Sequence, residues 1–273
     1  MTLKATAIVL VLLLGALPQS APQPPPSPSL APSPTLLAGQ RHFYNGHYEE
    51  AVAIATRLTV DDPNDLAASE LLTSILHFQI KRVLGDATDK EKALKQCASC
   101  DEILKTFLAE TKRAQAVARA RLKSHPGEDA TEFLLGKIDL NYVWLQLATL
   151  GRRTGWGEYR EARKSVEAVL KRTPNHLRAQ VAHAWIEYIV DSRVPFGFKW
   201  VLGGGDKKKA LAVMQKAAAS ASDPLDKTEA TFGLWEMLIQ EKKPKDAAVI
   251  ARALLIDFPE NKELLKFVAA NGK

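Results

Sequence analysis

The sequence has only two cysteines, no long hydrophobic run and little excess of one charge. Cys97 and Cys100 leave no second cysteine pair to complete a zinc site, and no histidine follows Cys100, as a haem attachment motif requires. The longest apolar run, about 13 residues from Ala5 to Leu17, is short for a membrane span. The net charge of +6 is too small and too scattered to indicate nucleic acid as a partner.

Signatures of catalysis are also missing from the sequence. The six histidines form no H-E-x-x-H motif, and there is no G-x-S-x-G motif. The glycines from Gly203 to Gly205 are followed by Asp206 rather than by the Lys-Ser or Lys-Thr of a phosphate-binding loop, and no predicted strand precedes them. We therefore expect neither an enzyme nor a bound metal or cofactor.

The first residues present a different composition from the rest. Residues 1–21 place one lysine before the apolar run, which is typical of a signal peptide, and residues 22–35 form a proline-rich linker. No clean small-x-small cleavage site precedes Pro22, so an uncleaved segment would instead act as an N-terminal membrane tether. We expect export, with a folded domain over 36–273 in the periplasm or associated with the cell envelope.

Apolar residues in the folded part recur with the spacing of helices. One such series, at intervals of three and four residues and followed by Gly85 as a stop signal, comprises Leu71, Leu72, Ile75, Leu76, Ile80 and Val83. The prolines of the folded part separate stretches of this kind, and they are Pro63, Pro126, Pro174, Pro195, Pro224, Pro244 and Pro259. This pattern predicts an all-α fold.

One spacing of residues occurs twice and part of it a third time. Intervals of 2, 3 and 12 residues separate Gly46, Tyr48, Ala51 and Pro63, and the same intervals separate Gly157, Tyr159, Ala162 and Pro174. Ala247 and Pro259 keep only the last interval. A small alanine lets two helices approach closely, and the proline ends the second helix. The pattern resembles the tetratricopeptide repeat (TPR) family, whose unit is a helix pair of about 34 residues, and Gly39 fits the glycine of the first helix.

The resemblance implies a right-handed superhelical stack of TPR-like helical hairpins with irregular insertions. Ala51, Ala162 and Ala247 lie 111 and 85 residues apart, which we interpret as three and two repeats of about 34 residues with extra segments. The first insertion is expected within 88–128, as one long helix or two broken ones. The second is expected between a helix over 176–190 and another over 206–220.

The glycine-rich stretch is expected to serve this second helix. Asp206 is placed to cap its first turn, and Gly203, Gly204 and Gly205 provide freedom for the chain reversal. The three lysines that follow, 207 to 209, lie at the positive end of the helix dipole, which is mildly unfavourable unless they hold an anion. A plain helix cap and an anion site remain the two alternatives.

A second resemblance covers about residues 130 to 265. The Pro-aromatic segment, the Gly-Gly-Asp turn and the helix ending in Lys-Ala-Ala resemble a group of exported bacterial TPR-like proteins. That resemblance implies a periplasmic or envelope-associated repeat protein without known catalysis. A neighbouring resemblance is to periplasmic repeat proteins that accompany tripartite solute transporters.

The cysteines and the aromatic residues leave further alternatives open. On one continuous helix, Cys97 and Cys100 would share the face of Leu94 and Phe107, which favours buried thiols or an incidental disulfide over redox or metal chemistry.

In the inserted loop, no helical period buries the aromatic residues Phe196, Phe198 and Trp200. These side chains either plug the concave face of the stack or line a pocket there.

The preferred function is therefore a non-catalytic exported scaffold for protein–protein interaction in the bacterial cell envelope, with a protein or peptide partner in the concave groove. The alternative is a periplasmic, transporter-associated protein that binds a small molecule or lipid in a pocket near residues 195–205.

Overall fold

The computed structural model describes residues 34–85, 87–193 and 202–272, and this part of the chain is helical with no strand. Its elements are α1 (Pro34–Asn45), α2 (Tyr48–Asp61), α3 (Leu66–Leu84), α4 (Lys90–Gln96), α5 (Cys100–Ser124), α6 (Asp129–Val143), the π-helical turn η1 (Trp144–Thr149), α7 (Trp156–Arg172), α8 (Leu177–Arg193), α9 (Lys207–Ser220), α10 (Pro224–Gln240), α11 (Pro244–Asp257) and α12 (Lys262–Asn271). The all-α prediction is confirmed. None of these helices is long and apolar enough to cross a membrane.

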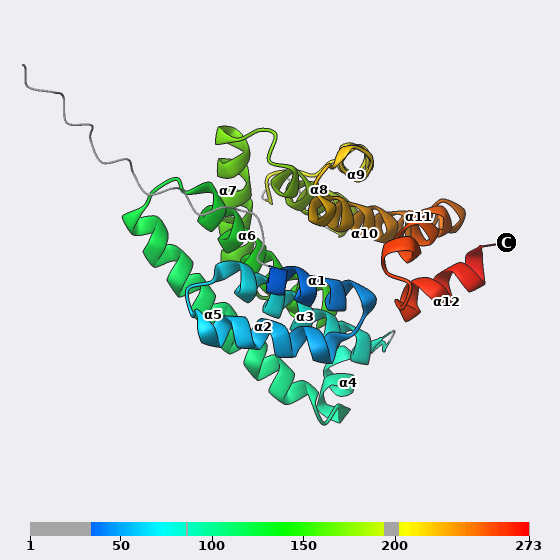
Figure 1. Cartoon of the computed structure of the whole chain (residues 1–273), viewed down its shortest axis with the longest axis horizontal. Coiled ribbons are helices and arrows are strands. Elements are labelled where there is room, and N and C mark those ends of the chain that lie inside the picture. The colour runs from blue at the N-terminus through cyan, green and yellow to red at the C-terminus, as the bar shows by residue number, and fades with distance from the viewer. Residues whose placement is uncertain (1–33, 86, 194–201, 273) are drawn as a thin grey trace, which may run out of the picture. The chain divides into compact units, whose positions relative to one another are not determined.

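The helices pack in successive pairs along the chain (Figure 1). The pairs within the described residues are α1–α2, α3–α5, α6–α7, α8–α9 and α10–α11, and α12 packs on the last of them. Each second helix also contacts the first helix of the next pair, as in a repeat stack. Only one pair, α3–α5, lies between Ala51 on α2 and Ala162 on α7, so their separation spans two repeats. The prediction of three was wrong.

The extra length has three sources. Helices α3 and α5 run for 19 and 25 residues, α4 is inserted between them, and residues 144–155 separate α6 from α7. The predicted insertion within 88–128 therefore consists of two helices, α4 and α5. The second insertion, between α8 and α9, also lies where it was expected. Helix α1 begins at Pro34, and a proline is well tolerated in a first helical turn.

The α1–α2 and α10–α11 pairs share one turn geometry. The amides of Gly46 and His47 donate to the carbonyls of Phe43 and His42 at 2.9 Å each. In the later pair the amides of Lys242 and Lys243 donate to the carbonyls three and five residues back, Ile239 at 3.0 Å and Leu238 at 2.9 Å. This is the Schellman pattern, in which the first amide belongs to a left-handed residue. The third copy thus keeps the turn although its glycine is replaced.

The second copy of the spacing does not keep that turn. Gly157 is the second residue of α7, whereas Gly155 has the positive φ, +93°, before the helix. The predicted equivalence of Gly46 and Gly157 is therefore wrong. The two glycines differ because the helices start at different points. Helix α2 begins three residues before Ala51, whereas α7 begins six residues before Ala162, since residues 144–155 replace the short turn.

Close approach of paired helices depends on small residues. Ala51, Ala162 and Ala247 are fully buried, as the repeat spacing predicts. A Cβ atom at Gly39 would lie 3.2 Å from Ile54 on α2, and one at Gly136 would lie 3.3 Å from the Ala162 carbonyl on α7. Gly136 therefore has the role in the α6–α7 pair that Gly39 has in the α1–α2 pair. The repeat spacing did not reveal it, because the insertion after α6 separates it from Ala162.

The apolar series on α3 is buried except at its end. Leu71, Leu72, Ile75, Leu76 and Ile80 are at most 3% exposed, whereas Val83, on the same helix, is 53% exposed. Gly85, at φ +46°, ends the helix as predicted. Periodicity predicts the helix, but by itself it carries no information about which of its residues a neighbouring helix covers.

The cysteine segment differs from the continuous helix that was considered. Helix α4 ends at Gln96 and α5 begins at Cys100, and a disulfide joins Cys97 to Cys100 across this break. Cys100 is fully buried in the same core as Leu94 and Phe107, with Ala93 and Leu104 packed against it. The predicted core environment is confirmed for Cys100, whereas the shared helical face is not.

Candidate functional site

The glycine-rich turn is a packed structural element. The Asp206 carboxylate accepts a hydrogen bond from the Lys209 amide at 2.9 Å, which confirms the predicted helix cap. Gly203 and Gly204 have φ of +83° and +79°, so they supply the predicted chain reversal. A Cβ atom at Gly205 would lie 2.6 Å from the Asp191 amide nitrogen on α8, so no larger residue fits there.

Arg163 of α7 holds this turn in place. Its guanidinium donates to the carbonyls of Leu202 and Gly203, both at 2.9 Å, and its side chain is 15% exposed. The repeat residue Tyr159 adds a hydroxyl bond to the Leu202 carbonyl at 2.9 Å. Sequence reasoning missed Arg163, although its spacing of four residues from Tyr159 places both on one face of α7.

The lysines after the turn do not form one site. The Lys207 ammonium pairs with the Glu241 carboxylate at 3.1 Å, while Lys208 and Lys209 are exposed. Of the predicted ligand or partner loop, Gly203 to Asp206 are used for internal packing. Phe196, Phe198 and Trp200 lie outside the described residues, so neither the plug nor the pocket prediction for them is tested.

A buried ion cluster lies among the first helices of the pairs. It consists of Glu70 on α3, Lys137 on α6, Arg178 on α8 and Glu229 on α10. Lys137 pairs with Glu229, Arg178 donates to Glu229 at 2.9 Å, and both cations also approach Glu70. These side chains are between 9% and 18% exposed. Two positive and two negative charges leave the cluster formally neutral.

The ionisation of this cluster follows from its surroundings. Burial by itself would raise the pKa of the Glu229 carboxyl, but the charges of Lys137 and Arg178 outweigh that effect and lower it to about 2. Burial would lower the pKa of Lys137, and the two glutamates raise it instead. The pKa shifts of Glu229 and Lys137 thus keep both side chains in their charged forms. We assign the cluster a structural role, since all four charges are compensated within it.

The ends of the described helical part meet beside this cluster. The ring of Tyr44 on α1 stacks on Phe232 of α10, with centroids 4.9 Å apart, and the Asn261 amide donates to the Tyr44 carbonyl at 2.7 Å. His47 contacts the Glu260 carboxylate at 3.0 Å. These contacts bring α1 together with α10 and with the turn before α12. The expected partner in the concave groove stays a prediction.

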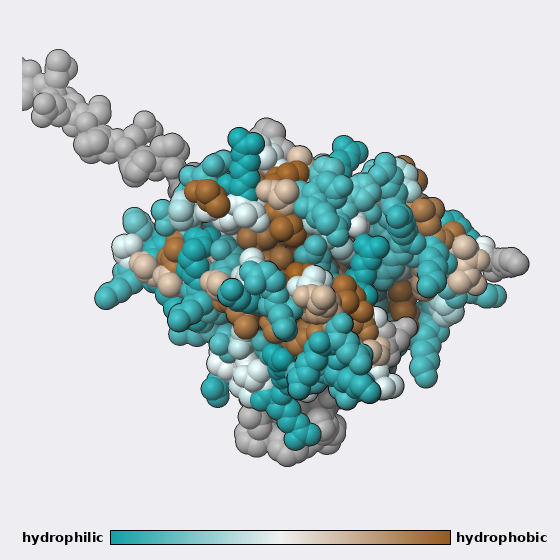
Figure 2. Space-filling model, turned by 90° about the horizontal axis from the view of Figure 1, so that it is seen from below, coloured by the Kyte–Doolittle hydropathy of each residue, from teal (hydrophilic) through white to brown (hydrophobic). Residues whose placement is uncertain are grey.

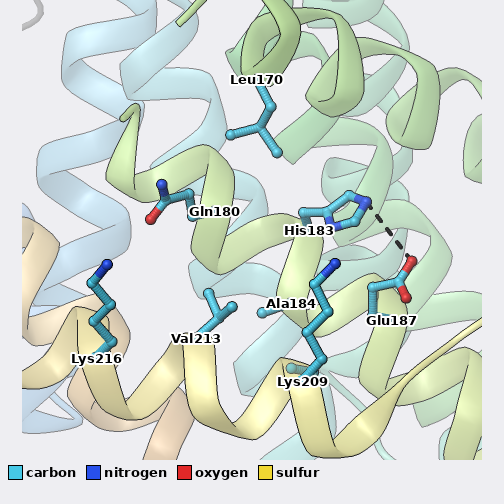
Figure 3. A pocket seen from close by; sticks show the side chains of 9 residues that line it. Leu170, Gln180, His183, Ala184, Glu187, Lys209, Val213 and Lys216 are labelled. Atoms are coloured by element: carbon cyan, nitrogen blue, oxygen red, sulfur yellow. Dashed lines mark ion pairs between the residues drawn. The ribbon is translucent and has the colours of Figure 1, made fainter. Parts of the chain in front are cut away.

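A more open surface lies between α7 and α9, over α8. We call it the α7–α9 groove, a hollow of about 230 Å³ lined by Leu170, Gln180, His183, Ala184, Glu187, Lys209, Ala210, Val213 and Lys216. Figure 3 shows Val213 and Ala184 between the side chains of Lys209 and Lys216, with Leu170 on the opposite wall. The groove combines apolar residues with charged residues at its rim.

The charges of the α7–α9 groove are unequally compensated. Its carboxylate, Glu187, pairs with Arg163 at 3.0 Å and approaches His183 at 3.8 Å. Lys209 and Lys216 are exposed and have no ion pair within the described part of the chain. The groove therefore presents two uncompensated positive charges beside an apolar floor.

A second hollow lies next to the glycine turn. It has a volume of about 290 Å³ and is lined by Tyr159, Arg160, Arg163, Lys164, Glu167, Leu202 and Gly203. Both hollows are smaller than the roughly 300 to 1,000 Å³ of typical small-molecule pockets. Among the described ranges no three metal-ligating side chains come together.

The helix pairs and their turns define an all-α repeat protein of TPR-like construction. No family model and no curated protein matches the sequence. The chain is similar to the crystal structure of a thermophilic TPR protein from Thermus thermophilus, with 14% identity over 86% of this chain and 96% of that one, and a TM-score of 0.48. The repeat character of this fold is defined by the pairing of its helices and by the turns between them.

Proposed function

We propose that this protein is a non-catalytic scaffold that binds another protein through its helical surface. The observation that carries the proposal is the α7–α9 groove, in which an apolar floor and two uncompensated lysines are exposed on a framework of packed helices. A hollow of about 230 Å³ suits a few side chains of a partner better than an enclosed small ligand.

Two further features support a surface that recognises protein. Figure 2 shows apolar residues gathered toward the middle of one face of the molecule, with hydrophilic residues around them. Apolar patches with a polar rim are typical of interaction surfaces. The buried ion cluster and the contacts of α1 with Phe232 on α10 and with Asn261, the N-cap of α12, join helices that are far apart in the sequence, which would hold such a surface in one shape before a partner binds.

The proposed setting is the bacterial cell envelope. It is supported by the lysine and apolar run of residues 1–21 and by the proline-rich composition of 22–35, which would place a spacer between an export signal or tether and the helical domain. Cell fractionation with N-terminal sequencing of the recovered protein tests this setting. A full-length chain in the cytosolic fraction would contradict it.

The scaffold proposal is tested by native mass spectrometry of the protein recovered from its own cells after gentle crosslinking, beside a denatured aliquot. We expect a stoichiometric complex with another polypeptide. Recovery without any polypeptide partner, or hydrolytic or redox activity that depends on a histidine or on Cys97, would overturn the proposal.

A second candidate function is the binding of a small anionic molecule or lipid head group beside the glycine turn. The hollow that contains Arg160, Lys164 and Leu202 favours it, because it lies next to the turn and carries cations at its rim. In the same mass measurement, an added mass of a few hundred daltons that disappears on denaturation would favour this candidate over the scaffold.

A further inference from the structure

We propose that the α7–α9 groove binds an acidic amphipathic helix of a partner protein, and this inference rests on the scaffold function proposed above. The occupant places two carboxylates against Lys209 and Lys216 and an apolar ridge against Val213 and Leu170.

The spacing of the cationic side chains matches a helix. Lys209, Val213 and Lys216 follow one another at four and three residues, so they share one face of α9. Seven residues of helix advance about 10.5 Å, and a partner helix that runs alongside α9 separates its own positions i and i+7 by the same length. Carboxylates at those two positions therefore meet both lysines at once.

The floor between the lysines accepts apolar side chains. Ala184 and Ala210 are buried, and Val213 and Leu170 are partly exposed. On a partner helix the positions i+3 and i+4 lie between its two acidic positions and would pack on this floor. Alanine at two of the floor positions lets another helix approach closely, since its side chain is small.

The electrostatics of the groove favour an acidic occupant over a basic or neutral one. Glu187 is engaged by Arg163, whereas the two lysines have no intramolecular carboxylate in the described part of the chain. Two carboxylates from outside, one against each lysine, therefore gain an attractive contact each without breaking an existing ion pair. Two lysines beside an apolar floor are also too few for a nucleic-acid backbone, which requires a basic stripe.

The inference is tested with a photocrosslinking amino acid at Val213 in the full-length chain, produced in its native host. The matched control carries the same amino acid at Ala212, which is exposed on α9 but does not line the groove. We expect Val213 to capture a partner segment, identified by mass spectrometry, with Asp or Glu at positions seven residues apart and apolar residues between them. The Ala212 control is expected to capture little.

Charge variants then decide whether the lysines select the partner. In the Lys209→Glu/Lys216→Glu variant we expect crosslinking at Val213 to fall at least about tenfold, which corresponds to the loss of a close charge pair. Lys208→Glu is the matched control, because Lys208 lies on α9 outside the groove, and its yield should stay near that of the parent. Circular dichroism checks that each variant remains folded.

The remaining outcomes separate this inference from the scaffold function. Capture of a segment without acidic residues, capture of a second copy of this chain, or equal losses in the Lys208 and Lys209/Lys216 variants would overturn the acidic-helix inference. A partner that crosslinks chemically to other faces but never at Val213 would overturn it while leaving the scaffold intact. The absence of any polypeptide partner would overturn both.

Discussion

The buried ion cluster and the α7–α9 groove use the same kinds of side chain to different ends. In the cluster, Lys137 and Arg178 face Glu70 and Glu229, and each charge is compensated by another from a distant helix. In the groove, Lys209 and Lys216 lie on one face of a single helix and have no intramolecular partner in the described residues. Compensation within the fold is the basis for the structural role assigned to the cluster, and its absence at an exposed hollow is the basis for the proposed partner surface.

The largest expected effect on the free energy of unfolding comes from removing one carboxylate of the buried ion cluster. Glu229→Ala leaves Lys137 and Arg178 with one carboxylate in a region of low exposure, and loss of one partner from a buried pair costs about 3 to 5 kcal/mol. Urea unfolding followed by circular dichroism measures the free energy. Glu236→Ala, which removes a more exposed pair with Lys81, is the control and should cost less than about 1 kcal/mol. Equal effects of the two variants would contradict the structural role of the cluster.

The same cluster predicts a dependence of stability on pH. The pKa of Glu229 is lowered from 4.5 to about 2 in the folded protein, so its stabilisation is fully present above the unfolded pKa near 4.5. It is lost as the pH falls through the folded pKa. We expect the difference in unfolding free energy between the parent and Glu229→Gln to shrink between about pH 4.5 and pH 2. A difference that stays constant over this range would contradict the assignment.

Arg163 is intermediate between the buried ion cluster and the exposed lysines of the groove. Its side chain is 15% exposed, and it binds both backbone carbonyls and carboxylates. Arg163→Ala removes charge-assisted bonds to the Leu202 and Gly203 carbonyls, and we expect a loss of about 1.5 to 3 kcal/mol in urea unfolding. Arg163→Lys keeps the charge without the planar fork and should recover only part of the loss. Full recovery by lysine would show that charge, rather than the clamp on the turn, is what matters.

The shared Schellman turn extends the comparison from side chains to the backbone. Lys242 has φ +57° where the first hairpin has Gly46 at φ +77°, and a side chain in that conformation is strained. Lys242→Gly should therefore raise the unfolding free energy by about 1 kcal/mol, after the greater freedom of glycine in the unfolded chain is subtracted. Lys243→Gly is the control, because its φ of −109° needs no glycine, and it should not stabilise the protein. Equal melting temperatures for the two variants would contradict this account.

The smallest effect on stability is expected at the groove. Lys209→Ala combined with Lys216→Ala removes two exposed charges that have no partner in the described residues, so the unfolding free energy should change by less than about 0.5 kcal/mol. Thermal unfolding at fixed salt measures it. A loss comparable to that of Glu229→Ala would mean that these lysines stabilise the fold, and the contrast between cluster and groove would no longer hold.

Local features of the fold were predictable from the sequence. The Asp206 cap, the Gly85 helix end and the buried Ala51, Ala162 and Ala247 depend on short-range chemistry and spacing. The assignment of Gly157 failed because an insertion moved the helix start, so that Gly155 takes the left-handed conformation. Spacing along the chain cannot distinguish a residue in a turn from one in the first turn of a helix when the connection changes length.

The candidate site was not predictable in the same way. Sequence reasoning emphasised the residues from Phe196 to Asp206, and of these Gly203, Gly204, Gly205 and Asp206 are occupied with internal packing. The groove joins residues from Leu170 to Lys216 on three helices, and its lysines resemble any other solvated lysines in the sequence. Only the tertiary structure brings them together at the rim of a hollow with apolar residues between them.

The sequence by itself determined that this protein is helical, that some of its helices pair through small residues and where many of them end, because periodicity, proline and capping side chains act over a few residues. The tertiary structure alone decided how many helix pairs lie between the repeats, which charges compensate one another and which stay exposed. The ion pairs of the cluster, for example, join α3, α6, α8 and α10, which are far apart in the sequence. Contacts between such distant segments cannot be inferred from spacing along the chain.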